Sequence, residues 1–476
     1  MTQLSRLIIK GGVLSPSELK EICETSEELG FETISFGSRQ DILFPEERTI
    51  TLTEVAGFEV VNEENAKAEN IMSSYVCADI FSSTPWLTSD KYLYVLEQFR
   101  YASELKINIT DPKQRLVPLF TGHLNFIASP HEDYWYLYVR LPYWNDIEIY
   151  PALIYSWDME KVARIIEDLL KEELDTIDLV FDLVNHSMDT NNRTIDEPLQ
   201  VPFHPFPYYE GMNRIGNDKY WLGLYWRNNK YDLAFLKAMC DLCFECKIGK
   251  ISITPWKSFI VKDIPSNTKL DWEKFLGRFG INVRHSMLEL NWHIPVGNSE
   301  ALELKKYLVR NFDKNDISTY GLTFGITDYA KTSYYFTSIV IEKNEVPEEL
   351  KEFNMRSTYN LLYAKNFDPN TREYLTNVRE VDKEELPDLL IELSRLYFEQ
   401  LGSEKEVEYT KVEESNEEVE VYQCKHCQSV YEEQYGDKAQ DIPPNTPFEN
   451  LDENYKCPLC ESSKDSFEKI VLKKIN

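Results

Sequence analysis

The C-terminal part of the chain carries four cysteines arranged as two Cys-x-x-Cys pairs, Cys424 with Cys427 and Cys457 with Cys460. Four thiolates presented in this way can surround one metal ion tetrahedrally. Such a sulfur-only site selects iron or zinc over hard cations. The spacing therefore predicts a metal centre near the C-terminal end, with these four residues as its ligands.

The residues around the two pairs narrow the choice of metal. Residues 422–431 and 455–460 contain the pairs, a proline follows Cys457, and the segment 446–448 between them reads Thr-Pro-Phe. Together these features resemble rubredoxin. The resemblance implies one iron atom that cycles between Fe(III) and Fe(II), and electron exit through the second cysteine of each pair, Cys427 and Cys460. It also implies an aromatic core made by Tyr422, Tyr431, Phe448, Tyr455 and Phe467.

Three positions depart from the rubredoxin pattern. Gln428 and Glu461 follow the two pairs where the family usually has glycine, and Asn445 replaces another common glycine. Glycine adopts positive φ without strain, and asparagine tolerates that conformation better than most residues. The two changes after the pairs predict strained turns or a shifted reduction potential. A structural zinc ribbon, which shares the cysteine spacing, remains the alternative.

Composition limits the classes of partner. The chain has 476 residues, with 51 basic and 81 acidic side chains and a net charge of −30. Such a surface disfavours nucleic acid and anionic membranes, and it attracts a basic docking face on a protein partner. No signal peptide or membrane span is predicted. Nine cysteines, four of them at metal spacing, are typical of a reducing compartment, so we expect a cytoplasmic protein.

A repeat organises the long segment before the metal centre. Ser15-Pro16-Ser17-Glu18 predicts a helix start with a capping box, and residues 33–36 and 42–44 read as strands. A second copy lies 217 residues later, the difference between Cys240 and Cys23, with Asp232 at the position of Ser15. A helix packed on strands and duplicated in this way predicts an α+β fold with pseudo-two-fold symmetry.

The repeat resembles the siroheme nitrite and sulfite reductases, whose ferredoxin-like half-domains are duplicated. The segment 37–40, Gly-Ser-Arg-Gln, looks like their strand-end Thr-x-Arg-Gln motif, and residues 69–72 look like the segment that follows. The similarity covers roughly residues 5 to 345. It implies that Arg39 occupies a position that binds the anionic siroheme.

The cysteines of that reductase family are missing. Residues 287–295 and 325–333 stand where the family holds a [4Fe–4S] cluster, and neither segment contains a cysteine. Glu69 replaces a usual arginine, and residues 119–124 replace a Lys-x-Lys segment. A ligand with many carboxylates needs several cations to be buried. We therefore expect neither siroheme nor a [4Fe–4S] cluster, and a body that has lost its catalytic centre.

The other cysteines, the amphipathic segments and the acidic stretch have structural interpretations that require no chemistry. The series Cys240, Cys243 and Cys246 invites an iron–sulfur interpretation, but the repeat places it on the inward face of a helix, so we expect core packing. Residues 160–184 predict one amphipathic helix, and residues 348–354 and 382–401 predict two more. The acidic stretch 402–420 predicts a tether, whose end can also pair as the first strand of the metal domain.

These expectations combine into one organisation. We predict two reductase-like halves at residues 1–205 and 206–401, an acidic linker at 402–419 and a rubredoxin domain at 420–476. The leading hypothesis is an electron carrier rather than an enzyme. It would serve a nitrite or sulfite reductase or an NAD(P)H-dependent electron donor. Two alternatives stay open: a siroheme-type reductase that uses the rubredoxin iron in place of the lost cluster, and a zinc-stabilised binding protein.

Overall fold

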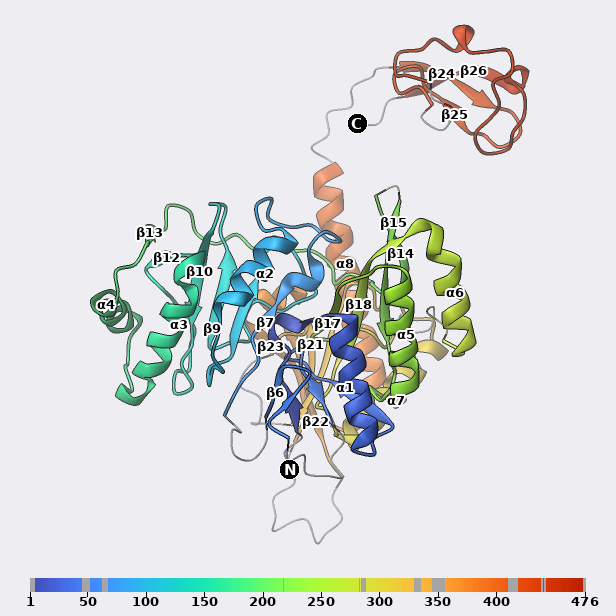
Figure 1. The fold of residues 1–476 in the computed structure, drawn as a ribbon. Coiled ribbons are helices and arrows are strands. Elements are labelled where there is room, and N and C mark those ends of the chain that lie inside the picture. Colours follow the sequence, from blue (N-terminus) through green and yellow to red (C-terminus); the bar gives the residue numbers. More distant parts are fainter. Residues whose placement is uncertain are drawn as a thin grey trace. The chain divides into compact units, whose positions relative to one another are not determined.

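The computed structural model describes residues 5–44, 52–61, 67–216, 218–281, 283, 288–328, 335–344, 356–409, 418–437, 440 and 442–473 (Figure 1). The chain divides into two compact units, Met1–Tyr397 and Phe398–Asn476. We call the first unit the body and the second the C-terminal unit. The half predicted at 1–205 falls in the body, as does the half predicted at 206–401 up to Tyr397, and the boundaries between the four predicted segments stay a prediction.

Two sheets of the body exchange strands between the repeats. The first has the order β16 (Tyr231–Asp232), β3 (Thr33–Phe36), β4 (Ile42–Leu43), β1 (Arg6–Leu7), β6 (Phe58–Val61) and β5 (Glu54–Val55). The other has the order β14 (Gly211–Ile215), β15 (Lys219–Tyr225), β18 (Ser258–Pro265), β17 (Ile251–Thr254) and β2 (Val13–Leu14). Strand β2 of the first copy thus pairs with β17 of the second, and β16 of the second pairs with β3 of the first. The exchange makes one core from both copies.

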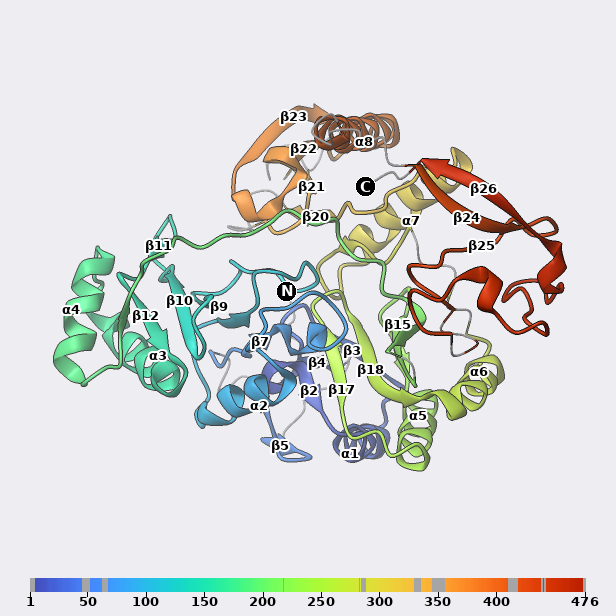
Figure 2. The same cartoon turned by 90° about the horizontal axis from the view of Figure 1, so that it is seen from above.

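Two equivalent helices follow the exchanged strands. Helix α1 (Pro16–Glu28) begins with the expected capping box, in which Ser15 and Glu18 bond each other's backbone N–H. Helix α5 (Leu233–Glu245) begins where the Asp232 carboxylate accepts from the N–H of Phe235 at 2.8 Å. Figures 1 and 2 show the two helices lying side by side. The predicted duplication is confirmed at these elements.

The duplication extends to two further sheets. One has the order β7 (Met72–Ser73), β8 (Ile107–Thr110), β9 (Leu124–Ala128), β10 (Tyr134–Val139), β12 (Ala152–Tyr155) and β13 (Arg193–Thr194), with β11 (Glu148–Ile149) beside β10. The other runs β19 (Trp292–His293), β20 (Phe324–Asp328), β21 (Ile339–Lys343), β22 (Tyr359–Ala364) and β23 (Tyr374–Val381). In both, the first three strands are parallel and the next two antiparallel. A helix links the first two strands of each, α2 (Ser89–Gln98) or α7 (Ser299–Lys314).

The expected long helix at residues 160–184 is wrong. The structure has α3 (Met159–Asp168) and α4 (Ile177–Ser187), separated by a short 3₁₀ turn. Glu173 adopts a left-handed conformation with φ of 46°, and the Thr176 side chain caps α4. No glycine or proline marks this break, so periodicity alone could not locate it.

The remaining elements lie in the second half of the chain. Helix α6 (Lys269–Arg278) follows β18. Helix α8 (Leu386–Tyr409) begins four residues after the start of the helix predicted at 382–401 and extends into the stretch expected to be a tether. The helix expected at 348–354 lies outside the described residues. None of the described helices combines the length and the hydropathy that a membrane-spanning segment requires.

The C-terminal unit contains a three-stranded antiparallel sheet in the order β25 (Val430–Tyr431), β24 (Glu418–Cys424) and β26 (Phe467–Lys473). Strand β24 includes the end of the predicted linker, so that end does pair as the first strand of the domain. Cys424 closes β24, opposite Phe467 at the start of β26. The sheet thereby places one cysteine pair directly after a strand.

Candidate metal centre and body cavity

The four C-terminal cysteines converge on one point. Their sulfur atoms all lie within 4.8 Å of one another. Cys427 Sγ is 3.4 Å from Cys457 Sγ, and Cys424 Sγ is 3.7 Å from Cys460 Sγ. Thiolates about 2.3 Å from a tetrahedral metal lie about 3.8 Å apart. The geometry therefore suits a single four-coordinate ion.

The two cysteine turns have the same hydrogen bonds. The N–H of Cys424 donates to the carbonyl of Ser429 at 2.8 Å, and the N–H of Cys457 donates to that of Ser462 at 2.9 Å. Each turn then closes through a left-handed residue, Gln428 with φ of 60° or Glu461 with φ of 58°. The resemblance to rubredoxin predicted glycine at these two positions. The backbone of both residues therefore adopts a conformation that L-residues disfavour.

Aromatic side chains pack beneath the cysteines. The rings of Tyr422 and Phe448 stack with centroids 4.1 Å apart, and Phe467 lies 5.4 Å from Phe448 and 5.8 Å from Tyr455. Tyr431 contacts both Phe448 and Tyr455. Buried Cys424 and Cys457 belong to the same hydrophobic cluster. This is the aromatic set that the sequence resemblance implied.

In the body, Arg39 lies among protein acceptors. Its Nη1 donates to Asn108 Oδ1 at 2.6 Å, and its Nη2 donates to the carbonyls of Asn70 and Ile107 at 2.7 and 2.9 Å. Both terminal nitrogens thus tie β8 and the segment before β7 to the turn between β3 and β4. The predicted role of Arg39 toward a siroheme-like anion stays a prediction.

Gln40, beside Arg39, links three parts of the body. Its amide exchanges hydrogen bonds with the backbone of Ser73 and donates to the carbonyl of Ile253 at 2.8 Å. Its φ of 62° matches the 58° of Lys257, its counterpart in the second copy. The two equivalent turns therefore share one backbone conformation but carry side chains of different charge.

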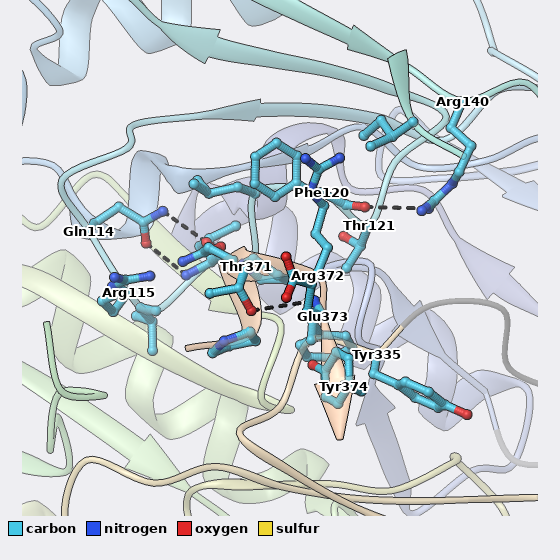
Figure 3. Close-up of a pocket in the computed structure, with 18 of the residues that line it drawn as sticks. Gln114, Arg115, Phe120, Thr121, Arg140, Tyr335, Thr371, Arg372, Glu373 and Tyr374 are labelled. Atoms are coloured by element: carbon cyan, nitrogen blue, oxygen red, sulfur yellow. Dashed lines mark hydrogen bonds between the residues drawn. The ribbon is translucent and has the colours of Figure 1, made fainter. Parts of the chain in front are cut away.

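A cavity of about 580 Å³ lies between the residues that follow β8 and those that precede β23 (Figure 3). Arg115, one of three arginines that line it, pairs with Asp368 at 3.0 Å. The buried Arg140 donates to the carbonyl of Phe120 at 3.3 Å, and the Arg372 guanidinium lies 5.0 Å from the Phe120 ring. Figure 3 shows the side chains of Arg140 and Arg372 beside Phe120.

The cavity does not suit a cysteine-ligated siroheme. Asp146 and Glu373 also line it, and with Arg115 paired the wall is too weakly basic for a ligand that carries many carboxylates. Among the described residues that line it there is no cysteine. The five cysteines of the body, Cys23, Cys77, Cys240, Cys243 and Cys246, are buried in hydrophobic clusters. Core packing of the last three is confirmed. Parts of the segments at 287–295 and 325–333 lie outside the described residues.

Comparison with known proteins decides the family of the metal centre. The rubredoxin family model matches residues 421–467. A probable rubredoxin-2 of Methanocaldococcus jannaschii is 47% identical over 49 residues, which cover 10% of this chain and 87% of that protein. Residues 421–467 place the chain in the rubredoxin family. A high molecular weight rubredoxin of Moorella thermoacetica is also 47% identical over 49 residues, but the match covers only 21% of its length.

The body matches a solved structure. The structure of the Mycobacterium tuberculosis NirA protein superposes with a TM-score of 0.61 and 16% identity, covering 82% of this chain and 80% of that chain. Similarity at this level shows the fold. The predicted fold class, a nitrite/sulfite reductase-like body with a small C-terminal rubredoxin domain, is therefore confirmed.

The rubredoxin domain exposes one side of its metal centre. Cys460 is exposed and Cys427 is half-buried, whereas Cys424 and Cys457 are buried. Leu459, next to Cys460, is 75% exposed. The outermost sulfur therefore has an exposed apolar side chain next to it in the sequence. Electron exit through Cys427 and Cys460 stays a prediction that this exposure supports.

Sequence reasoning missed Ser462. Its hydroxyl lies 2.6 Å from Cys460 Sγ and 3.5 Å from Cys424 Sγ. Hydrogen bonding with the Ser462 hydroxyl is the main reason why the pKa of Cys424 is lowered to about 6, and it is also the main reason why the pKa of Cys460 is lowered. The signal was present, because a serine stands two residues after each cysteine pair, as Ser429 and Ser462.

Proposed function

We propose that the protein is a one-electron carrier in which a rubredoxin iron centre serves a nitrite or sulfite reductase system. The chain joins a rubredoxin domain to a nitrite/sulfite reductase-like scaffold, and this combination carries the proposal. The cysteine geometry supports iron at Cys424, Cys427, Cys457 and Cys460. Bound iron supplies one-electron chemistry between Fe(III) and Fe(II).

The residues of the rubredoxin domain have separate tasks in this function. The aromatic cluster excludes water from the buried sulfurs of Cys424 and Cys457. The hydroxyl of Ser462 and backbone N–H groups of the two turns stabilise negative charge on sulfur, which sets the potential. Exposed Leu459 and Cys460 form the contact point for a partner. Because all of these groups are fixed before the electron arrives, little rearrangement accompanies transfer.

The body is proposed to act as a docking scaffold without chemistry of its own. Its cysteines are buried in the core, and the wall of the cavity in Figure 3 carries both arginine and carboxylate side chains. A net charge of −30 favours a partner with a basic docking face. Transfer to such a partner is expected to slow as salt is added, because screening weakens attraction between charged surfaces.

Metal analysis and the visible spectrum of the purified full chain test this proposal. We expect a red protein with one iron per chain that dithionite bleaches reversibly. Cys424→Ser removes a ligand and should abolish the colour. Cys246→Ser, which changes a buried cysteine outside the metal centre, should retain it. A colourless chain that carries one zinc would refute the proposal and favour a zinc-stabilised binding protein.

The shared fold also favours a second candidate, a siroheme-type nitrite or sulfite reductase that uses the rubredoxin iron in place of a [4Fe–4S] cluster. The cavity's mixed charge and lack of cysteine weigh against it. Expression with ample siroheme separates the two. A tetrapyrrole absorbance band and viologen-dependent nitrite reduction would support the reductase, and their absence would leave the electron carrier.

A further inference from the structure

A second cavity of about 360 Å³ lies elsewhere in the body. Three segments meet around it: strands β3 and β4, residues 225–230 with the turn at 256–257, and the connection from β19 to α7. Its volume falls within the range of small-molecule sites, about 300–1,000 Å³. Trp256 lines both this cavity and the one in Figure 3, which otherwise have different walls.

The wall of this cavity is basic. Four cations line it, Arg227, Lys230, Lys257 and Lys305, and none of the lining residues that the structure describes is acidic. The chain as a whole has 81 acidic and only 51 basic side chains. Four cations in one wall oppose the overall charge, and the one carboxylate that pairs with two of them leaves a local positive potential that attracts anions.

Of the four cations, Lys257 gives the strongest evidence for an anion site. It is 6% exposed, and the carbonyl of Ile294 accepts one of the three N–H donors of its ammonium group. Among the described residues, no carboxylate forms an ion pair with it. A buried ammonium group without a counter-ion is costly, and an anionic ligand would remove that cost.

Lys305 and Arg227 share a single carboxylate. Glu289 lies 3.5 Å from Lys305 Nζ through one oxygen and 3.1 Å from Arg227 Nε through the other. Lys305 is 2% exposed and also donates to the hydroxyl of Tyr225. One negative charge thus faces two positive charges, and Lys257 adds a third.

The wall also supplies a helix end and two flat apolar faces. Asn298 and Ser299 line the cavity at the start of α7, whose 16 residues point their positive dipole end toward it. Asn298 Oδ1 caps the helix by accepting from the N–H of Ala301 at 2.9 Å. Trp256 and Trp292 line the cavity, together with smaller apolar residues such as Leu43 and Val296.

We propose that this cavity binds a small organic anion, a phosphate or carboxylate group carried on a flat apolar body. Lys257 and Lys305 hold the anionic group, and the two tryptophans pack against the apolar part. The site lies wholly within the body and does not depend on the electron-transfer function proposed above. It gives the reductase-like scaffold a ligand of its own.

Binding at this site is expected to take up a proton. Burial and the charge of Lys305 lower the pKa of Lys257 to about 7, and burial lowers that of Lys305 to about 8. The other groups near Lys257 do not change charge near neutral pH. His293 is neutral because burial lowers its pKa to about 3, and Tyr231 is neutral because burial raises its pKa. A bound anion stabilises the charged lysines and so recruits a proton.

Calorimetry with the full chain tests the proposal. The probes are AMP, benzene-1,3-dicarboxylate and uncharged adenosine. We expect AMP or the dicarboxylate to bind saturably and adenosine to bind much more weakly. In buffers of different ionisation enthalpy, the heat at about pH 8 should reveal proton uptake. Binding by one probe and not the other identifies the anionic group as phosphate or carboxylate.

A matched pair of variants identifies the site. Lys257→Met should weaken binding at least about tenfold, because it removes a charge-assisted hydrogen bond, whereas Lys257→Arg should retain part of the affinity. Lys262→Met is the control. Lys262 is also 6% exposed, but its Nζ donates to the carbonyls of Tyr75 and Ala78, and it does not line the cavity. Its removal should leave affinity unchanged.

Several results would overturn the proposal. Absence of saturable binding by both anions would do so, as would equal binding of AMP and adenosine. Unchanged affinity in Lys257→Met would show that the anion binds elsewhere. An equal loss in Lys262→Met would show a general effect on the fold. Loss of affinity in Lys257→Arg comparable to that in Lys257→Met would refute the role of the charge.

Discussion

Replacing Ser462 by alanine should lower the reduction potential of the iron centre. The Ser462 hydroxyl lies 2.6 Å from Cys460 Sγ and 3.5 Å from Cys424 Sγ. The reduced centre carries one more negative charge than the oxidised one, so a donor to sulfur stabilises the reduced form more. Ser462→Ala removes that preference, and the potential becomes more negative.

The size of the shift follows from the hydrogen bond. A hydrogen bond to a charged group contributes about 1.5–3 kcal/mol. Only the difference between the two oxidation states affects the potential, and solvent competes at exposed Cys460, so about 1 kcal/mol remains. For one electron, a tenfold change in the equilibrium constant, about 1.4 kcal/mol, corresponds to about 59 mV. We therefore expect a shift of about 40 mV.

A potentiometric titration followed by visible absorbance measures this shift in the full chain. Ser429→Ala is the matched control, because Ser429 occupies the equivalent position in the other cysteine turn and its hydroxyl forms no hydrogen bond to sulfur among the described residues. Its potential should change little. A Ser462→Ala potential equal to that of the parent chain, or higher, would refute the reasoning.

Two further predictions concern stability. Gln428→Gly and Glu461→Gly relieve positive φ at a cost in unfolded-chain entropy, so each should raise the unfolding free energy of the iron-loaded rubredoxin domain by about 0.5–1 kcal/mol. Loss of iron absorbance in denaturant measures it, and Ser463→Gly, at φ of −65°, should instead destabilise. The second prediction concerns pH. Because the pKa of Lys257 is lowered to about 7 by burial, the unfolded chain binds more protons above that value. This group should therefore raise the unfolding free energy of the body from neutral to alkaline pH by up to about 1.4 kcal/mol per pH unit. Burial also lowers the pKa of Lys305, to about 8, so Lys257→Met should reduce the rise without removing it in denaturant titrations followed by tryptophan fluorescence. Identical slopes in both proteins would contradict this assignment.

The parts of the fold that sequence could predict are those fixed by short-range rules. Two cysteine pairs and the residues between them specify a metal centre locally, because ligands and turns lie within one short segment. The helix starts at Ser15 and Asp232 were predictable because a capping side chain bonds N–H groups within three residues of itself. These local signals revealed the repeat, and the repeat in turn predicted the fold class.

The rest depends on contacts between distant segments. The exchanged strands β2 and β16 have two residues each, too few for any periodic pattern, and their partners lie more than a hundred residues away. No glycine or proline lies at the break near Glu173, so the sequence does not indicate it. The basic cavity could not be predicted from the sequence for a similar reason, because its lysines come from a turn and from a distant helix.

The two units make their chemistry from separate sets of residues. The hydrogen bonds that shape the cysteine turns run between residues 424 and 466, and the basic cavity is lined only by residues 33–305. Loss of iron in Cys424→Ser should therefore leave anion binding intact, and Lys257→Met should leave the potential unchanged. If either variant altered both properties, the body would influence the metal centre directly, and a passive docking scaffold would be the wrong description of its role.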